Sequence, residues 1–120
     1  MEVEIISLAD TAGLASPQQV SSAVGTLIPA YPAIKIGVHL HSTPVNWKEK
    51  IDAALQAGCT RFDGALKGIG GCPMAGDELV GNMNTELMVH YLKGKNLLNG
   101  IDMNALEVAS RMAVKIFGVH

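Results

Sequence analysis

The sequence lacks three features that would each indicate a particular class of protein. It has no apolar run near the roughly 20 residues that span a bilayer. Its N-terminus lacks the basic and then apolar profile of a secretory signal. Its nine lysines and arginines are scattered at a formal net charge of −2, without the basic stripe that nucleic acid or an anionic membrane requires. We therefore expect a cytoplasmic protein with no nucleic-acid or membrane partner.

Cysteine is also scarce, because Cys59 and Cys72 are the two in 120 residues. Two cysteines do not make a disulfide framework, and we expect both thiols to be reduced. The hydrophobic content of 48% is enough for a real core, and the length fits one domain. Disorder is therefore excluded as the main state of the chain.

Short apolar runs recur along the chain at intervals that fit βα units. Residues 2–9, a short run with β-branched residues, and residues 34–41 and 60–66 predict strands. Their starts lie about 30 residues apart, which is the length of a strand with its crossover helix. Three successive βα units predict a parallel sheet covered by helices.

Capping residues mark the expected helix starts. Ser16 followed by Pro17 and Gln19 predicts an N-cap, a first helical residue and a capping box. Asn46 with Glu49 three residues later predicts a second capped helix.

Two further helices are expected in the last third of the chain. The first begins near residues 84–86, with an inward face formed by Leu87, Met88, Tyr91 and Leu92. Asp102 is expected to cap the second, whose buried stripe is Leu106, Ala109, Met112, Ala113 and Ile116.

Polar residues gather where the predicted strands end. His39 and His41 are two residues apart on a strand, so both imidazoles point to the same face, which suggests a metal site. Asp10 and the glycine-rich loop at 68–82 also follow strands. This arrangement fits an open doubly wound sheet or a (β/α)8 barrel, but a closed barrel takes about 250 residues. The pattern therefore fits part of a barrel better than a whole one.

Three motifs, in order, resemble the 3-hydroxy-3-methylglutaryl-CoA (HMG-CoA) lyase family. They are Ser7-Leu-Ala-Asp-Thr-Ala-Gly13, Val38-His-Leu-His-Ser-Thr43, and Gly68-Ile-Gly-Gly-Cys-Pro73 with Gly81-Asn82 and Thr85-Glu86. The resemblance implies an α/β fold that is the C-terminal portion of a TIM (β/α)8 barrel, about three βα units plus a final helix. Residues 1–120 would then be a partial TIM-barrel domain, HMG-CoA lyase-like.

The resemblance also implies a reaction and a site. The reaction is metal-dependent cleavage of HMG-CoA, or a close acyl-CoA analogue, to acetoacetate and acetyl-CoA. The ligands of the divalent cation, Mg²⁺ or Mn²⁺, would be His39, His41 and Asn82. The catalytic residues would be Cys72, His39, Asp10 and Glu86, with Cys72 or His39 protonating the acetyl-CoA enolate. A homodimer is the assembly that the resemblance suggests.

The chain departs from the family pattern at several positions. Ser42 stands where the family usually has aspartate, and Met74 stands where it usually has tyrosine. The family's first strand supplies an arginine and a metal-binding aspartate that have no counterpart here. We therefore expect the isolated chain to be incomplete for catalysis, with either a second copy or a missing N-terminal half of the barrel as its partner.

Other interpretations of the same residues stay open. An aldolase or Claisen-type synthase of the same metal-dependent group is the alternative enzyme, and a non-catalytic, self-associating barrel fragment is the alternative from another class. Asp10 fits the end of a strand or a turn cap equally well, and Glu86 fits the acid of a helix first turn. Cys72 taken alone fits a small buried hydrophobic residue.

Overall fold

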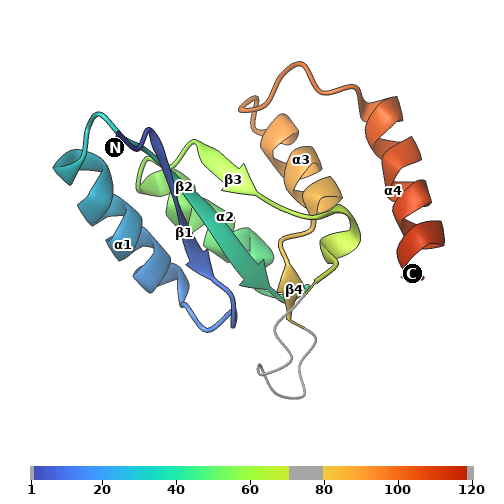
Figure 1. Ribbon diagram of the computed structural model, residues 1–120, viewed down its shortest axis with the longest axis horizontal. Coiled ribbons are helices and arrows are strands. Elements are labelled where there is room, and N and C mark those ends of the chain that lie inside the picture. Colours follow the sequence, from blue (N-terminus) through green and yellow to red (C-terminus); the bar gives the residue numbers. More distant parts are fainter. Residues whose placement is uncertain (1, 71–79, 119–120) are drawn as a thin grey trace.

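The computed structural model describes residues 2–70 and 80–118 of the chain (Figure 1). The elements are, in order, β1 (Ile5–Asp10), α1 (Pro17–Ala30), β2 (Lys35–Ser42), α2 (Trp47–Gln56), β3 (Arg61–Asp63), the short 3₁₀ helix η1 (Leu66–Gly68), β4 (Gly81–Asn82), α3 (Thr85–Gly94) and α4 (Met103–Phe117). Within these described ranges, no helix is both long enough and apolar enough to cross a bilayer.

Strand β2 is the centre of the sheet. It pairs in parallel with β1 on one side and with β3 on the other, and β4 adds a short antiparallel pairing at its carboxyl end. The expected α/β class with a parallel sheet is thus confirmed. Strand β3 is shorter than the 60–66 run predicts, and the two-residue strand β4 was not predicted.

The two faces of β2 have different neighbours. Val38 and Leu40 are buried in one core with Val24 of α1 and Ile51 of α2, both of which are fully buried. Burying an aliphatic side chain of this kind contributes about 1.5–3 kcal/mol. Because side chains alternate along a strand, the residues between these positions face the side of the sheet that α1 and α2 leave uncovered.

Most of the predicted helix caps are confirmed. Ser16 and Gln19 form the reciprocal capping box, and Asp102 accepts a backbone N–H at the third residue of its helix, as predicted. Asn84, which was not predicted as a cap, accepts the corresponding N–H of α3. Asn46 is the correction, because its side chain makes no cap hydrogen bond.

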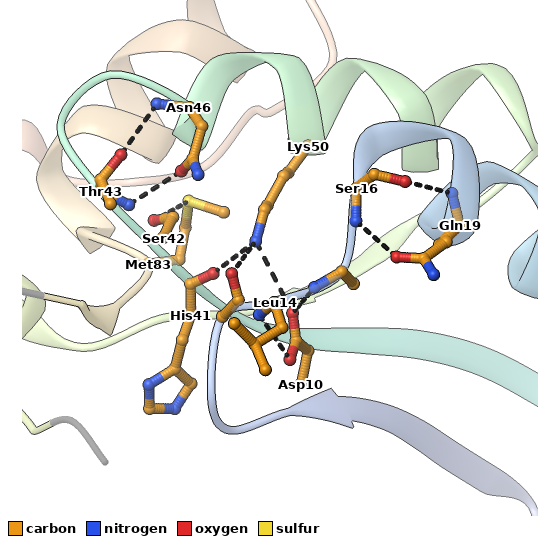
Figure 2. A network of polar contacts seen from close by, with 12 residues as sticks. Asp10, Leu14, Ser16, Gln19, His41, Ser42, Thr43, Asn46, Lys50 and Met83 are labelled. Atoms are coloured by element: carbon orange, nitrogen blue, oxygen red, sulfur yellow. Dashed lines mark hydrogen bonds and ion pairs between the residues drawn. The ribbon is translucent and has the colours of Figure 1, made fainter. Parts of the chain in front are cut away.

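The reason lies in the turn before α2. The Asn46 amide oxygen accepts the Thr43 N–H at 2.8 Å, and the Asn46 N–H donates to the Thr43 hydroxyl at 3.2 Å. The side chain therefore closes the preceding turn instead of capping the helix (Figure 2).

The predicted buried faces of the last two helices are partly wrong. Met88 and Leu92 of α3 are buried, but Leu87 is 43% exposed. In α4, Ala113 is buried, whereas Met112 and Ile116 are 54% and 67% exposed. Figure 1 shows the cause, since α4 stands beside α3 and away from the sheet, where its apolar stripe has little to pack against.

The capping box makes a measurable contribution to stability. We expect Ser16→Ala to lower the free energy of unfolding by about 1 kcal/mol, because the Gln19 N–H loses its acceptor. Urea denaturation followed by circular dichroism measures this. Ser22→Ala, at an exposed position inside the same helix, is the matched control and should leave stability unchanged or slightly higher. Equal losses in the two variants would contradict the capping role.

Candidate metal and acyl-CoA site

The pairing of β2 with β4 brings together three of the predicted site residues. His41 lies directly opposite Asn82 in the antiparallel register. His39 and His41 project from the same face of β2, with ring centroids 5.7 Å apart, so the predicted pairing of the two imidazoles is confirmed. Residues 39 and 82, distant in sequence, are therefore neighbours at the carboxyl end of the sheet.

Asn82 is held by the backbone at the start of the glycine-rich loop. Its N–H donates to the Gly70 carbonyl at 2.9 Å, and its side-chain Nδ2 donates to the Ile69 carbonyl at 2.8 Å. The second bond fixes the orientation of the amide, because only Nδ2 can donate to the Ile69 carbonyl and Oδ1 must therefore point away from it. Gly70 has φ +86°, and a Cβ there would approach Nδ2 to 2.8 Å, so this position favours glycine.

The Asn82 amide oxygen therefore faces His39. Its Oδ1 lies 2.9 Å from Nε2 of His39, and Nδ1 of the same ring lies 3.4 Å from the Asp63 carboxylate. A neutral imidazole has one N–H, and the two contacts compete for it. With the proton on Nε2, the ring donates a hydrogen bond to Oδ1. With the proton on Nδ1, toward Asp63, the lone pair of Nε2 and the Asn82 oxygen lie side by side as two ligands for a cation.

His41 is the second imidazole of the site. The residue is 6% exposed, and its Nδ1 is buried without a hydrogen-bond partner among residues 2–70 and 80–118. Burial lowers the pKa of His41, and the neighbouring His39 and Lys50 lower it further, while Asp10 opposes the shift. His41 is thus kept neutral, which is the form that binds a metal.

These donors fit a divalent cation with mixed nitrogen and oxygen ligands. No three histidine, cysteine, aspartate or glutamate side chains in the described part of the chain are grouped to hold an ion, so a site here needs the Asn82 amide. Two ligands on adjacent corners of an octahedron with bonds of about 2.1 Å lie about 3.0 Å apart. The 2.9 Å between His39 Nε2 and Asn82 Oδ1 is compatible with that spacing, and it is equally the length of a hydrogen bond between the two atoms.

Asp10 lies in a turn at the end of β1. Its Oδ1 accepts the Leu14 N–H at 3.2 Å, and its Oδ2 accepts the Ala15 N–H at 2.8 Å. The Lys50 ammonium lies 3.6 Å from Oδ2 (Figure 2). These contacts match the turn-capping alternative for Asp10 and place its carboxylate next to the backbone of His41, which Lys50 also contacts.

Glu86 anchors the start of the glycine loop. Both carboxylate oxygens accept the Lys67 N–H, at 3.1 and 3.0 Å, and Lys67 has φ +59°. Burial by itself raises the pKa of Glu86, but hydrogen bonds from Ser110 and from the Lys67 backbone outweigh it and hold the pKa below its usual value. Glu86 therefore stabilises a strained turn that leads toward the site.

Cys72 and Met74 lie outside the described residues. Cys59 is buried, and its thiol is free as expected. Burial raises the pKa of the Cys59 thiol, so it is an unreactive core group.

Two residues of this region were missed from sequence. Asp63 could have been noticed because it is an acidic residue inside the predicted strand at 60–66, which neighbours the strand of His39. The burial of Lys50 could not be recognised from the sequence, because a lysine in an amphipathic helix normally faces solvent.

Comparison with known proteins identifies relatives along nearly the whole chain. Residues 1–113 match the family model described as HMGL-like. The chain is 43% identical over 105 residues to the (R)-citramalyl-CoA lyase of Chloroflexus aurantiacus, covering 88% of this chain and 33% of that protein. It is 36% identical over 106 residues to a hydroxymethylglutaryl-CoA lyase of Bacillus subtilis, covering 88% of this chain and 35% of the relative. The chain thus spans about a third of the length of these relatives.

Solved structures agree with the sequence comparison. The HMG-CoA lyase of Bacillus subtilis superposes with a TM-score of 0.81 at 35% identity, over 93% of this chain and 37% of that one. An HMG-CoA lyase from Acinetobacter baumannii, in complex with coenzyme A and 3-methylmalate, superposes with a TM-score of 0.79 at 35% identity, over 94% of this chain and 37% of that one.

The depressed pKa of His41 makes stability depend on pH. The folded-state pKa lies below the ordinary value of 6.5, so the unfolded chain binds a proton first as the pH falls. This contribution is complete above pH 6.5 and is lost as the pH falls toward the folded-state pKa, at a slope of at most about 1.4 kcal/mol per pH unit. We expect His41→Gln to flatten the decline in the free energy of unfolding between pH 7.5 and 5.5.

Urea titrations with EDTA present at each pH measure the slope. His90→Gln, on the exposed face of α3, is the matched control and should keep the parent slope. If the free energy of unfolding of His41→Gln fell with pH as steeply as that of the parent chain, the His41 ring would not be held in its neutral form.

Proposed function

Because the chain belongs to the HMGL-like family, we propose that it forms part of a metal-dependent acyl-CoA carbon–carbon lyase. The substrate class is a 3-hydroxy-3-methyl acyl-CoA with a free carboxylate, and HMG-CoA is the first candidate. The single observation that carries the proposal is the convergence of His39, His41 and the Asn82 amide at the carboxyl end of a parallel sheet. Sites of (β/α)8 enzymes lie at this end of the strands.

The proposed cation ligands are His39, His41 and Asn82, and Mg²⁺ or Mn²⁺ suits them. When bound, the cation supplies Lewis-acid polarisation of the substrate's hydroxyl and carboxylate oxygens. The chain's own residues do the remaining work. Asp63 orients the His39 ring through Nδ1, and the Ile69 carbonyl orients the Asn82 amide so that its oxygen faces the site.

Proton transfer is assigned to the loop cysteine and the strand histidine. Removal of the substrate hydroxyl proton lets the bond between C2 and C3 break, and the resulting thioester enolate takes up a proton at C2. Cys72 or His39 is the proposed donor for that step. Asp10 and Glu86 complete the proposed catalytic set, and their contacts support a role in holding the β1 turn and the glycine loop.

We propose that residues 1–120 are a partial TIM-barrel domain that supplies the C-terminal portion of the barrel. Strands β1 and β3 each have one edge that pairs with no other described strand. Val3, which lies before β1, is 51% exposed, and Ile5, the first residue of β1, is 44% exposed. Met112 and Ile116 of α4 are exposed as well. Exposed strand edges and apolar surface favour association, either with the rest of a barrel or with a second copy in a dimer.

A second substrate is favoured by the comparison itself. The chain is more similar to the citramalyl-CoA lyase, at 43% identity, than to the hydroxymethylglutaryl-CoA lyase, at 36%. Citramalyl-CoA has one methylene fewer between its tertiary alcohol and its carboxylate. The same bond cleavage then gives pyruvate in place of acetoacetate, so the products distinguish the two substrates.

The decisive experiment is product analysis with both acyl-CoA esters. The purified chain is assayed with and without Mg²⁺ or Mn²⁺, alone and after co-expression with the N-terminal two thirds of the Bacillus subtilis relative. We expect acetyl-CoA release that requires the co-expressed portion, with acetoacetate from HMG-CoA or pyruvate from citramalyl-CoA.

Each outcome has a distinct meaning. Cleavage of either ester supports the lyase, and its second product names the substrate. Condensation of acetyl-CoA with a 2-oxo acid would instead indicate a synthase of the same group. A stable co-expressed complex that cleaves neither ester would contradict the proposed function.

Asp63 provides a separate test of the metal site. We expect Asp63→Asn to weaken Mn²⁺ binding by about 10-fold to 100-fold, because the His39 ring loses the carboxylate that orients it. Isothermal titration calorimetry measures the affinity. Asp52→Asn is the matched control, since Asp52 accepts the Tyr91 hydroxyl between α2 and α3. Equal Mn²⁺ affinity in both variants would remove Asp63 from the site.

A further inference from the structure

Lys50 is a charged residue in the core of the molecule. It lies in α2 with a side chain 1% exposed, and it is among the largest fully buried side chains of the described residues. Burial of an ammonium is costly unless acceptors replace the lost water. An exposed position on the same helix is available two residues earlier, at Lys48. A solubilising role does not explain why Lys50 points inward.

The acceptors of the Lys50 ammonium come from two different strand ends. Its Nζ donates to the His41 carbonyl at 3.0 Å and to the Gly13 carbonyl at 3.1 Å, and it lies 3.6 Å from the Asp10 carboxylate. The two carbonyls accept hydrogen bonds from two of the three N–H donors of the ammonium, and the Asp10 carboxylate lies at ion-pair distance. Figure 2 shows the ammonium between the turn after β1 and the end of β2.

His41 lies beyond the parallel pairing of its strand. The β1 register ends at Asp10 opposite Leu40, and the β3 register ends at Asp63 opposite His39. His41 also stands opposite Asn82 of β4, and its carbonyl accepts a hydrogen bond from Lys50. Lys50 contacts the His41 backbone from the helix side, while the His41 ring points away from the ammonium (Figure 2).

We propose that Lys50 is a positioning residue that fixes the His41 imidazole for cation binding by fastening the end of β2 to the turn after β1. This inference rests on the proposed function, because it assigns His41 to the metal. Lys50 itself touches neither the cation nor the substrate. Its partner Asp10 balances its charge, so the pair holds the strand ends without adding a net charge to the site.

The direction in which Lys50→Met changes the Mn²⁺ affinity distinguishes a positioning role from a purely electrostatic one. Lys50→Met removes a positive charge near the proposed dication site, and the loss of Coulomb repulsion alone would strengthen Mn²⁺ binding. If Lys50 acts by positioning, the same change weakens binding because the His41 backbone loses its anchor. We expect the Mn²⁺ affinity of Lys50→Met to fall at least tenfold, in the range known for residues that orient metal ligands.

The experiment measures Mn²⁺ binding to the 120-residue chain by calorimetry, for the parent, Lys50→Met and Lys48→Met. Lys48→Met removes the same charge from the surface of the same helix, and its affinity should stay within about twofold, as expected for an exposed, screened charge. Lys50→Gln retains an amide donor for one carbonyl and should show a smaller loss than Lys50→Met. Dispersed amide signals in the NMR spectrum establish that each variant is folded.

A second readout does not depend on the metal. In the metal-free chain, long-range ¹H–¹⁵N spectra report the ring nitrogens of His41, and we expect these signals to shift or broaden in Lys50→Met but not in Lys48→Met. A parent that fails to bind Mn²⁺ would count against the proposed metal site, and the His41 signals would still decide the role of Lys50. Unchanged or tighter Mn²⁺ binding with unchanged His41 signals would overturn the inference. Unfolding of both Lys50 variants would overturn it too, since Lys50 would then be a stability residue.

Discussion

The position of β2 between its neighbours is the constraint on which the structure depends. Because it pairs with β1, β3 and β4, β2 must present one row of side chains to α1 and α2 and the other to the uncovered face. Its aliphatic residues occupy the first row and its histidines the second. A shift of one residue in register would place both imidazoles in the helical core and leave the aliphatic residues outside.

Features set by local chemistry could be predicted from sequence. The capping box at Ser16, the cap at Asp102 and the shared face of His39 and His41 each depend on residues a few positions apart. The cap expected at Asn46 failed because Thr43, also local, offered a competing pair of hydrogen bonds. Local sequence patterns thus indicate which hydrogen bonds are possible, and the backbone conformation of the folded turn determines which of them forms.

Features that depend on distant pairing could not be predicted in the same way. A two-residue strand such as β4 has no periodicity, so nothing in the sequence alone set Asn82 opposite His41. The buried ammonium of Lys50 requires carbonyls from two strand ends that meet only in the folded state. The stripe along α4 was read correctly as apolar, but periodicity does not say whether another element covers it, and Met112 and Ile116 are exposed.

The hydrogen bond from Asn82 to Ile69 restricts which ligand this position can hold. An aspartate would bring a full negative charge to a dication and would therefore be the obvious improvement on an amide. It would also aim a carboxylate oxygen at the Ile69 carbonyl, at the 2.8 Å where the amide now donates. The resulting repulsion would push the chain just before Gly70 away from β4. The hydrogen bonds to Ile69 and Gly70 thus favour a neutral side chain at this proposed ligand position, because the amide keeps these two residues bound to β4.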